Sequence, residues 1–189
     1  MPRRRFVLLD RDGTIIVDKQ YLADPEGVEL LDGAVEGLAR LAGLGLGLAV
    51  VTNQSAIGRG RLDERGLERI HLTMLRLLNE HGVGLDGVYW CPHIPEDDCA
   101  CRKPRTGLVD RAVAELDFDP ARAFVVGDKR SDIDLGRALG ATTLLVRTGE
   151  GARTENELAS RPDHVVDDLS GAAAVIERLL AVENGTGIG

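Results

Sequence analysis

Short apolar runs alternate with amphipathic segments along most of the chain. Residues 6–9, Phe-Val-Leu-Leu, form an unbroken apolar run of the kind found in strands that are buried on both faces. Residues 62–80 instead place apolar side chains at helical spacing, with Leu67, Ile70 and Met74 on one side. By these two patterns, strands are predicted over 6–9, 46–51, 87–90, 123–126, 143–146 and 163–166. Helices are predicted over 34–44, 62–80, 107–116, 131–139 and 170–182.

The regular order of strands and helices predicts an α/β fold, a doubly wound parallel sheet with helices on both faces. A length of 189 residues suits one domain, so the whole chain, 1–189, is expected to form a single unit. Ser131 is the expected N-cap of the fourth helix, and residues 184–189 are expected to be a frayed tail. In such sheets ligands bind beyond the carboxyl ends of the strands, so the polar residues after each apolar run are candidate site residues.

Composition narrows the classes of partner. Lysine and arginine number 23 against 31 aspartate and glutamate residues, a net charge of −8, which excludes a nucleic-acid binder with a broad basic face. No apolar run approaches the roughly 18 residues of a membrane helix, and the start of the chain lacks the apolar stretch of a signal peptide. We therefore expect a cytoplasmic protein that binds neither nucleic acid nor membrane. No long exposed apolar stripe is evident, so a monomer is expected.

Two aspartates follow the first predicted strand, in the segment Asp10-Arg-Asp12-Gly-Thr14. Carboxylates two residues apart at a strand exit can point into the same site, and the glycine permits the sharp turn that follows them. One carboxylate can attack phosphorus while the other handles the proton of the leaving group. The alternative is that both aspartates only form a turn.

Three further segments carry polar groups of matching chemistry. After the second predicted strand, hydroxyl and amide groups can donate to a phosphoryl oxygen, and a basic pair before Pro104 can neutralise phosphoryl charge. After the 123–126 strand, a carboxylate can complete a Mg²⁺ site with Asp10. Taken singly, these segments are equally well explained as polar turns or as ordinary basic surface. Their order at successive strand ends indicates one site, formed with Asp10 and Asp12 by Thr52, Asn53, Gln54, Ser55, Arg102, Lys103, Asp128 and Asp132.

Three cysteines and a histidine lie together in Cys91-Pro-His93 and Cys99-Ala-Cys101. An odd number of clustered cysteines is unlike a secreted disulfide framework. Three thiolates and one imidazole are the four ligands of a closed tetrahedral Zn²⁺ site, which would be structural and would hold the basic pair that follows it. The alternative is a set of buried thiols without metal. No role is assigned to the remaining histidines, His71, His81 and His164.

Four segments of the chain resemble the four motifs of the haloacid dehalogenase superfamily of phosphotransferases. They are Asp10-x-Asp12-Gly-Thr14, Thr52, Lys103 and Gly127-Asp128-x-x-x-Asp132. The resemblance extends over residues 6–146. Neither interval that holds a mobile cap domain in this superfamily is long enough here for a large one, so an open site is implied.

The resemblance also implies the role of each motif residue. Asp10 is the nucleophile that forms an aspartyl-phosphate, and Asp12 protonates the leaving alcohol and then activates water. Thr52 and Lys103 hold the transferring phosphoryl group. Mg²⁺ is implied at the carboxylates of Asp10 and Asp128 and at the main-chain carbonyl of Asp12. The Asp132 carboxylate is implied to support that site from behind.

A zinc loop directly before an Arg-Lys-Pro segment is similar to one branch of the superfamily, which contains heptose bisphosphate 7-phosphatases and histidinol-phosphate phosphatases. Residues 18–21, 53–60, 127–129 and 146–149 look like the substrate loops of the heptose enzymes. The short zinc loop is instead similar to that of the histidinol-phosphate enzymes, and Ala56 stands where the heptose family usually has glycine. We favour the heptose interpretation, which implies a second phosphate on the substrate.

This interpretation implies a Mg²⁺-dependent hydrolysis of the C7 phosphate of D-glycero-D-manno-heptose 1,7-bisphosphate, a small phosphorylated sugar, in heptose and lipopolysaccharide precursor synthesis. The residues implied in substrate binding are Asp18, Lys19, Gln20, Tyr21, Thr52, Asn53, Gln54, Ser55, Arg59, Arg102, Lys103 and Lys129.

Two alternatives stay open at this point. The same chemistry could act on histidinol phosphate, or the domain could be a zinc-stabilised regulatory module in which Asp10 accepts phosphate without turnover. Asp12, placed to activate water, argues against the second alternative. A Rossmann dinucleotide-binding domain is excluded, because the first strand is followed by Asp-x-Asp-Gly rather than by Gly-x-Gly-x-x-Gly.

Overall fold

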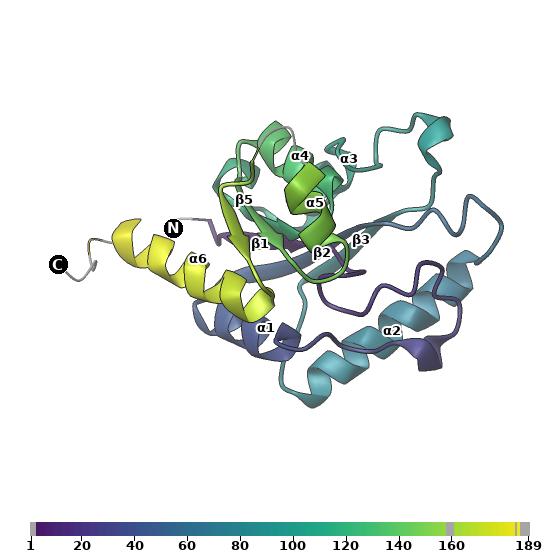
Figure 1. Cartoon of the computed structure of the whole chain (residues 1–189), viewed down its shortest axis with the longest axis horizontal. Coiled ribbons are helices and arrows are strands. Elements are labelled where there is room, and N and C mark those ends of the chain that lie inside the picture. Colours follow the sequence, from purple (N-terminus) through teal and green to yellow (C-terminus); the bar gives the residue numbers. More distant parts are fainter. Residues whose placement is uncertain (1–2, 158–160, 184, 186–189) are drawn as a thin grey trace.

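The structure, a computed structural model, describes residues 3–157, 161–183 and 185. Its centre is one sheet of six parallel strands in the order β3-β2-β1-β4-β5-β6 (Figure 1). The strands are β1 (Phe6–Leu9), β2 (Gly47–Asn53), β3 (Gly87–Cys91), β4 (Phe124–Gly127), β5 (Thr142–Val146) and β6 (His164–Val166). The chain builds outward from β1 to β3, then crosses back to the other side of β1 for β4. The switch point of this doubly wound sheet therefore lies between β1 and β4, where α/β proteins bind ligands.

Helices cover both faces of the sheet (Figure 1). One face packs against α1 (Ala34–Gly43), α2 (Glu64–Glu80) and α6 (Leu169–Glu183), and the other against α3 (Gly107–Leu116) and α4 (Arg130–Leu139). Because successive strand residues point to opposite faces, alternate residues of β1 belong to two different cores. This double burial explains why the strands are continuous apolar runs.

The predicted elements are confirmed with shifts of one or two residues at their ends, but one predicted cap is wrong. The fourth helix begins at Arg130, and its N-cap is Lys129, whose backbone amide donates to the Asp132 carboxylate at 3.0 Å. Ser131 therefore lies inside the first turn and does not cap it. One helix was not predicted, α5 (Gly151–Glu157), because it buries only Gly151 and Thr154 and has no apolar stripe to reveal it. The predicted tail, 184–189, falls outside the described residues except for one position.

Two long connections shape the carboxyl edge of the sheet. Residues 10–33 link β1 to α1, and residues 92–106 link β3 to α3. The only helical segment in each is a short 3-10 turn, at Pro25–Gly27 and Pro95–Asp97, so no large cap domain stands over the described part of the sheet. Among the described residues, none of the helices combines the length and the apolar character that a membrane span requires.

Candidate active site

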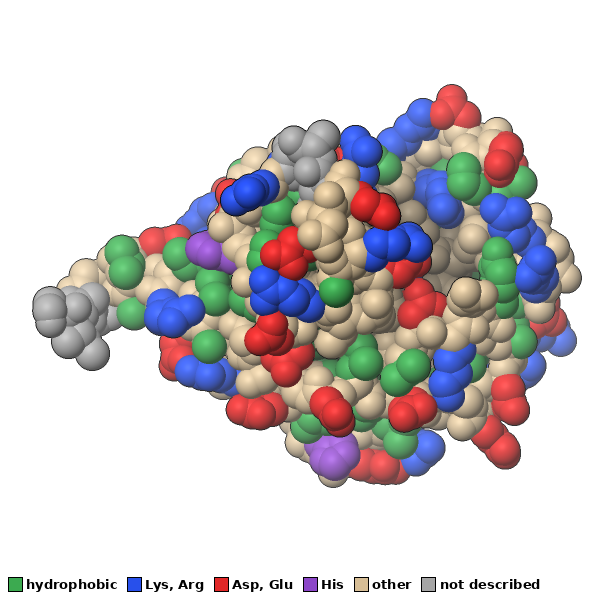
Figure 2. Space-filling view, viewed as in Figure 1, with side chains coloured by type: hydrophobic (Ala, Val, Ile, Leu, Met, Phe, Trp, Pro, Cys, Tyr) green, Lys and Arg blue, Asp and Glu red, His purple; other side chains and the backbone are tan. Residues whose placement is uncertain are grey.

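Most of the predicted site residues meet where β1, β2 and β4 end. A cavity of about 480 Å³ opens there, a volume typical of small-molecule sites. Figure 2 shows a hollow to the right of the centre of the view, with acidic side chains inside it and lysine and arginine side chains around it. The cavity is lined by Asp10, Arg11, Asp12, Asp18, Gln20, Tyr21, Leu22, Thr52, Asn53, Gln54, Ser55, Ala56, Arg102, Lys103, Lys129, Ser131 and Glu150.

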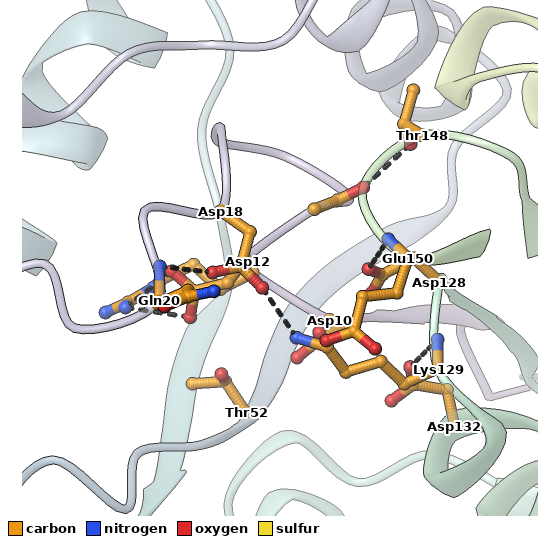
Figure 3. A network of polar contacts seen from close by, with 12 residues as sticks. Asp10, Asp12, Asp18, Gln20, Thr52, Asp128, Lys129, Asp132, Thr148 and Glu150 are labelled. Atoms are coloured by element: carbon orange, nitrogen blue, oxygen red, sulfur yellow. Dashed lines mark hydrogen bonds and ion pairs between the residues drawn. The ribbon is translucent and has the colours of Figure 1, made fainter. Parts of the chain in front are cut away.

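Three buried carboxylates and one lysine form the centre of this site. Asp10, Asp128 and Asp132 bring one carboxylate oxygen each within 4.8 Å of one another (Figure 3). The Lys103 ammonium lies between two of them, with its Nζ 2.9 Å from Asp10 Oδ1 and 2.6 Å from Asp132 Oδ1. All four side chains are at most 6% exposed, so these charges act on one another with little screening by water.

The electrostatics of the cluster favour an additional cation. Burial alone would raise the pKa of Asp10, but the positive charges of Lys103 and Lys129 outweigh it, and the pKa of Asp10 is lowered. Burial and the negative charge of Asp10 raise the pKa of Asp128 to about 8. The carboxylates outnumber the ammonium group that contacts them, so a divalent cation or a bound proton is needed to balance the charge.

The Asp128 carboxylate has the features expected of a magnesium ligand. Its Oδ2 accepts a hydrogen bond of 2.8 Å from the backbone amide of Glu150, whereas its Oδ1 is buried and has no hydrogen-bond partner among the described residues (Figure 3). A buried carboxylate oxygen without a donor is costly unless a cation occupies the position next to it. Gly13, at φ +82°, packs so closely on this carboxylate that a Cβ there would lie 2.3 Å from Oδ2. The residues present therefore fit Mg²⁺ beside Asp10 and Asp128.

Thr52 and Lys103 are fixed by neighbouring amides at the end of β2. The Thr52 hydroxyl, 1% exposed, accepts a hydrogen bond of 2.8 Å from Gln54 Nε2. Asn53 clamps the backbone of Lys103, since its Oδ1 accepts from the Lys103 amide at 3.0 Å and its Nδ2 donates to the Lys103 carbonyl at 3.2 Å. The ammonium group of Lys103 is therefore held in the site by its own backbone as well as by its carboxylate partners.

The sequence analysis missed Arg11 at the site and His71 behind it, besides the lining residues Leu22, Ser131 and Glu150. Arg11, between the two motif aspartates, turns inward and is 2% exposed. Its Nη2 contacts both oxygens of Asp12, and its Nη1 lies 3.0 Å from Nε2 of His71 on α2. Because Arg11 and His71 are 60 positions apart, no local pattern reveals their contact. The only signal was a histidine on the apolar side of a predicted helix.

The predicted substrate segment 18–21 forms one wall of the cavity. Lys129 Nζ lies 2.9 Å from Asp18 Oδ2, which fastens the segment to the start of α4 (Figure 3). The guanidinium of Arg61 stacks over the Tyr21 ring at 4.1 Å. Two predicted substrate residues do not line the cavity: Lys19 pairs with Glu29 at 3.4 Å, and Arg59 is exposed on the loop after β2.

The cysteines and His93 converge as predicted. Sγ and Nδ1 atoms of Cys91, His93, Cys99 and Cys101 lie within 4.8 Å of one another, and five of the six separations range from 3.1 to 3.6 Å. A tetrahedral zinc with Zn–S bonds of about 2.3 Å sets ligand separations of about 3.5–3.8 Å. The three thiols form no disulfide, and burial is the main cause that raises the pKa of Cys91, so a metal is what would stabilise its thiolate. The cluster fits a closed zinc site.

This cluster is tied directly to the cavity. The backbone amide of Gln54 donates to the backbone carbonyl of Cys91 at 2.7 Å, and Arg102 Nη1 donates to the backbone carbonyl of His93 at 3.0 Å. The loop therefore positions both the end of β2 and the basic pair Arg102–Lys103.

A family model described as HAD-hydrolase-like matches residues 100–172. The chain is 37% identical over 182 residues to D-glycero-beta-D-manno-heptose-1,7-bisphosphate 7-phosphatase of Haemophilus influenzae, covering 92% of this chain and 97% of the relative. It is also 37% identical over 180 residues to the enzyme of the same name from Escherichia coli (strain K12), covering 91% and 93%.

Solved structures agree with these sequence matches. D,D-heptose 1,7-bisphosphate phosphatase from B. bronchiseptica, solved with magnesium and phosphate, superposes with a TM-score of 0.86 at 32% identity, covering 93% of this chain and 99% of that one. The similarity extends over nearly the whole of both chains.

Proposed function

The chain belongs to the family of D-glycero-beta-D-manno-heptose-1,7-bisphosphate 7-phosphatases within the HAD-like hydrolases, and we propose that it hydrolyses the C7 phosphate of this sugar bisphosphate to heptose 1-phosphate. The observation that carries the proposal is the buried convergence of Asp10, Lys103 and Asp128 at the carboxyl ends of β1 and β4. The relatives described above carry the heptose name, which favours this substrate over histidinol phosphate.

In the first half of the reaction, a carboxylate oxygen of Asp10 attacks the C7 phosphorus and the bond from phosphorus to the sugar oxygen breaks. The lowered pKa of Asp10 keeps it ionised for this attack. Asp12 gives its proton to the departing sugar oxygen, while Thr52 and Lys103 bind the transferring phosphoryl group. The products of this step are heptose 1-phosphate and an aspartyl-phosphate on Asp10.

In the second half, Asp12 takes a proton from a water molecule, whose oxygen attacks the phosphorus of the aspartyl-phosphate. Inorganic phosphate leaves and the Asp10 carboxylate is restored, with the Asp12 proton regained for the next cycle. Asp10, Asp128 and the main-chain carbonyl of Asp12, with support from Asp132, would hold Mg²⁺, and the ion would supply positive charge to neutralise the phosphoryl oxygens.

The far end of the substrate carries a second phosphate and several hydroxyl groups. We assign its binding to residues of the cavity wall, above all the 18–21 segment, Ser55, Arg102 and Lys129, whose donors and charges suit a phosphorylated sugar. Zn²⁺ at the cysteine cluster is proposed as structural, since four protein ligands leave no open position. A single domain over 1–189, a monomeric state and a cytoplasmic location stay predictions.

The test is phosphate release in the presence of Mg²⁺, comparing heptose 1,7-bisphosphate with histidinol phosphate by kcat/KM. We expect a preference of several tens-fold or more for the heptose substrate, with heptose 1-phosphate as the product. The reverse preference would contradict the proposal and would assign specificity to the short zinc loop rather than to residues 18–21. A long-lived aspartyl-phosphate without turnover would instead support the regulatory module.

A further inference from the structure

A buried network of hydrogen bonds surrounds the Asp12 carboxylate. Arg11 Nη2 donates to both of its oxygens, at 2.9 Å and 2.8 Å, and Gln54 Nε2 donates to Oδ2 at 2.7 Å. The same Gln54 Nε2 donates to the Thr52 hydroxyl, and Gln54 Oε1 accepts from Arg11 at 3.0 Å. The orientation of the Asp12 side chain is therefore set by two neighbours that are themselves connected.

Arg11 depends in turn on His71. Its guanidinium is 2% exposed, and the only carboxylate that contacts it among the described residues is Asp12. Nη1 points away from Asp12 to Nε2 of His71, 3.0 Å away, while Nε has no hydrogen-bond partner in the described part of the chain. Without His71, a second nitrogen of this buried cation would lack an acceptor.

The chemistry of the pair fixes the state of the histidine. A guanidinium donates hydrogen bonds and accepts none, so Nε2 of His71 must be the acceptor and the ring must be neutral. Burial and the positive charge of Arg11 lower the pKa of His71 to about 3, which agrees with a ring that stays neutral. His71 is 7% exposed and projects from the apolar side of α2, so its position is fixed by the helix.

We propose that His71 is a positioning residue of the phosphatase reaction: it holds the guanidinium of Arg11, and through it the Asp12 carboxylate, in the orientation needed for proton transfer. This inference rests on the proposed function, because it assigns Asp12 the role of acid and base. General acid–base catalysis contributes about 10²–10⁴-fold to a rate, and a misplacement of about 1 Å can cost about 10²-fold. A residue that sets the orientation of the Asp12 carboxylate through Arg11 can therefore change the rate without contacting the substrate.

The variants compare loss of the acceptor with its retention. His71→Leu removes the acceptor and keeps an apolar side chain of similar size, whereas His71→Gln offers a neutral carbonyl oxygen at similar reach. We expect H71L to lower kcat/KM for the sugar phosphate about 10- to 100-fold with little change in KM, and H71Q to recover most of the activity. If H71L does not fold, His71→Asn takes its place, since its carbonyl is one methylene too short to reach Arg11.

Substrates with different leaving groups distinguish a positioning role of His71 from a general loss of activity. Nitrophenyl phosphate releases a stable phenolate that needs no proton, so the step reported by its kcat/KM is insensitive to the acid role of Asp12. We expect less than about a 3-fold loss with nitrophenyl phosphate in H71L, against 10- to 100-fold with the sugar phosphate. Equal losses on both substrates, or equal activity in the leucine and glutamine variants, would overturn the proposal.

The same experiment keeps this inference distinct from the proposed function. If the wild-type protein does not hydrolyse heptose 1,7-bisphosphate, the substrate assignment fails. The ratio between a simple alkyl phosphate and nitrophenyl phosphate can still be compared across the His71 variants. An unchanged ratio in that comparison would remove His71 from the mechanism whatever the natural substrate is.

Discussion

At the scale of single residues, Asp10 is the side chain on which the chemistry depends. The carboxylate oxygen has to attack phosphorus, and an amide cannot replace it as a nucleophile. We therefore expect Asp10→Asn to lower kcat by at least about 10³-fold. Because the change removes one of three clustered carboxylates and leaves Lys103 paired with Asp132, the fold should persist, which thermal unfolding would check. An active D10N protein would contradict the mechanism.

Single site residues could be predicted from the sequence where a chemically suitable side chain directly follows a predicted strand or turn. The motif carboxylates, Thr52 and Lys103 each follow a strand or a turn, so their convergence could be predicted from the rule that parallel strands end at one edge. The contact of His71 with Arg11 could not, because it joins a helix face to a strand exit across 60 positions. Arg59 is a prediction that the structure does not support. Its positive charge suggested a phosphate ligand, but it is exposed on the loop after β2 and does not line the cavity.

At the scale of elements, continuous apolar runs predicted the strands well because every central strand is buried on both faces. Helices with an apolar stripe were equally clear. The helix α5 was missed because its sequence, Gly151–Glu157, is polar and its position depends on contacts with the preceding strand. The cap of α4 was misassigned because several polar residues at the start of this helix could serve as its N-cap. In the structure the Asp132 carboxylate accepts the hydrogen bond of the Lys129 backbone amide, which makes Lys129 the N-cap.

The packing of α1 on α6 makes a sharp prediction for one glycine. A Cβ on Gly37 would lie 2.4 Å from the backbone carbon and oxygen of Leu169, so the two helices approach through this position. We expect Gly37→Ala to lower the free energy of unfolding by about 2 kcal/mol, because backbone overlap outweighs the gain in helix propensity of about 1 kcal/mol.

Gly43 is the matched control for this substitution in the same helix. Apart from its chain neighbours and the backbone of its own helix, no described atom lies within 4 Å of the Cβ it would gain. Gly43→Ala should therefore be neutral or stabilising by up to about 1 kcal/mol. Urea unfolding of both variants tests the packing, and an equal effect at the two positions would contradict it.

The cysteine loop is the second element with a direct test. Protein purified without added zinc should contain about one Zn²⁺ per chain if all four ligands bind one ion. Cys101→Ser should lower the zinc content, the unfolding temperature and kcat/KM together, because this cysteine directly precedes Arg102 and Lys103. Glu96→Gln, an exposed change in the same loop, is the matched control and should leave all three unchanged. If the protein contained no zinc and were as stable as zinc-supplemented protein, the zinc hypothesis would be contradicted and the cysteines would be buried thiols without metal.

At the scale of the whole molecule, the buried carboxylates of the site lower the stability of the folded protein. Burial and the charge of Asp10 raise the pKa of Asp128 to about 8, from 3.8. Between these two values the Asp128 carboxyl binds more protons in the folded protein than in the unfolded chain, so its contribution to stability falls as the pH rises. His71 acts in the opposite direction below pH 6.5, because its pKa is lowered from 6.5 to about 3 on folding. The magnesium-free protein should therefore lose stability mainly as the pH increases from about 6.5 to about 8. Mg²⁺ should restore it, because a bound cation favours the ionised carboxylate.

Asp128→Asn separates these two effects. The asparagine side chain is neutral at every pH and can still accept the hydrogen bond from the Glu150 amide. We expect D128N to unfold at a higher temperature than the wild type at pH 8 without Mg²⁺, by a margin that disappears near pH 4, and to lose both its response to Mg²⁺ and its activity. Unfolding should be measured after dialysis against magnesium-free buffer rather than with a chelator, which would also remove zinc.

Asp134→Asn, at a partly exposed position on α4, is the control without a metal role. If D128N were less stable than the wild type at pH 8, the three carboxylates would be held by contacts stronger than their mutual repulsion, and the need of this site for a cation would be contradicted.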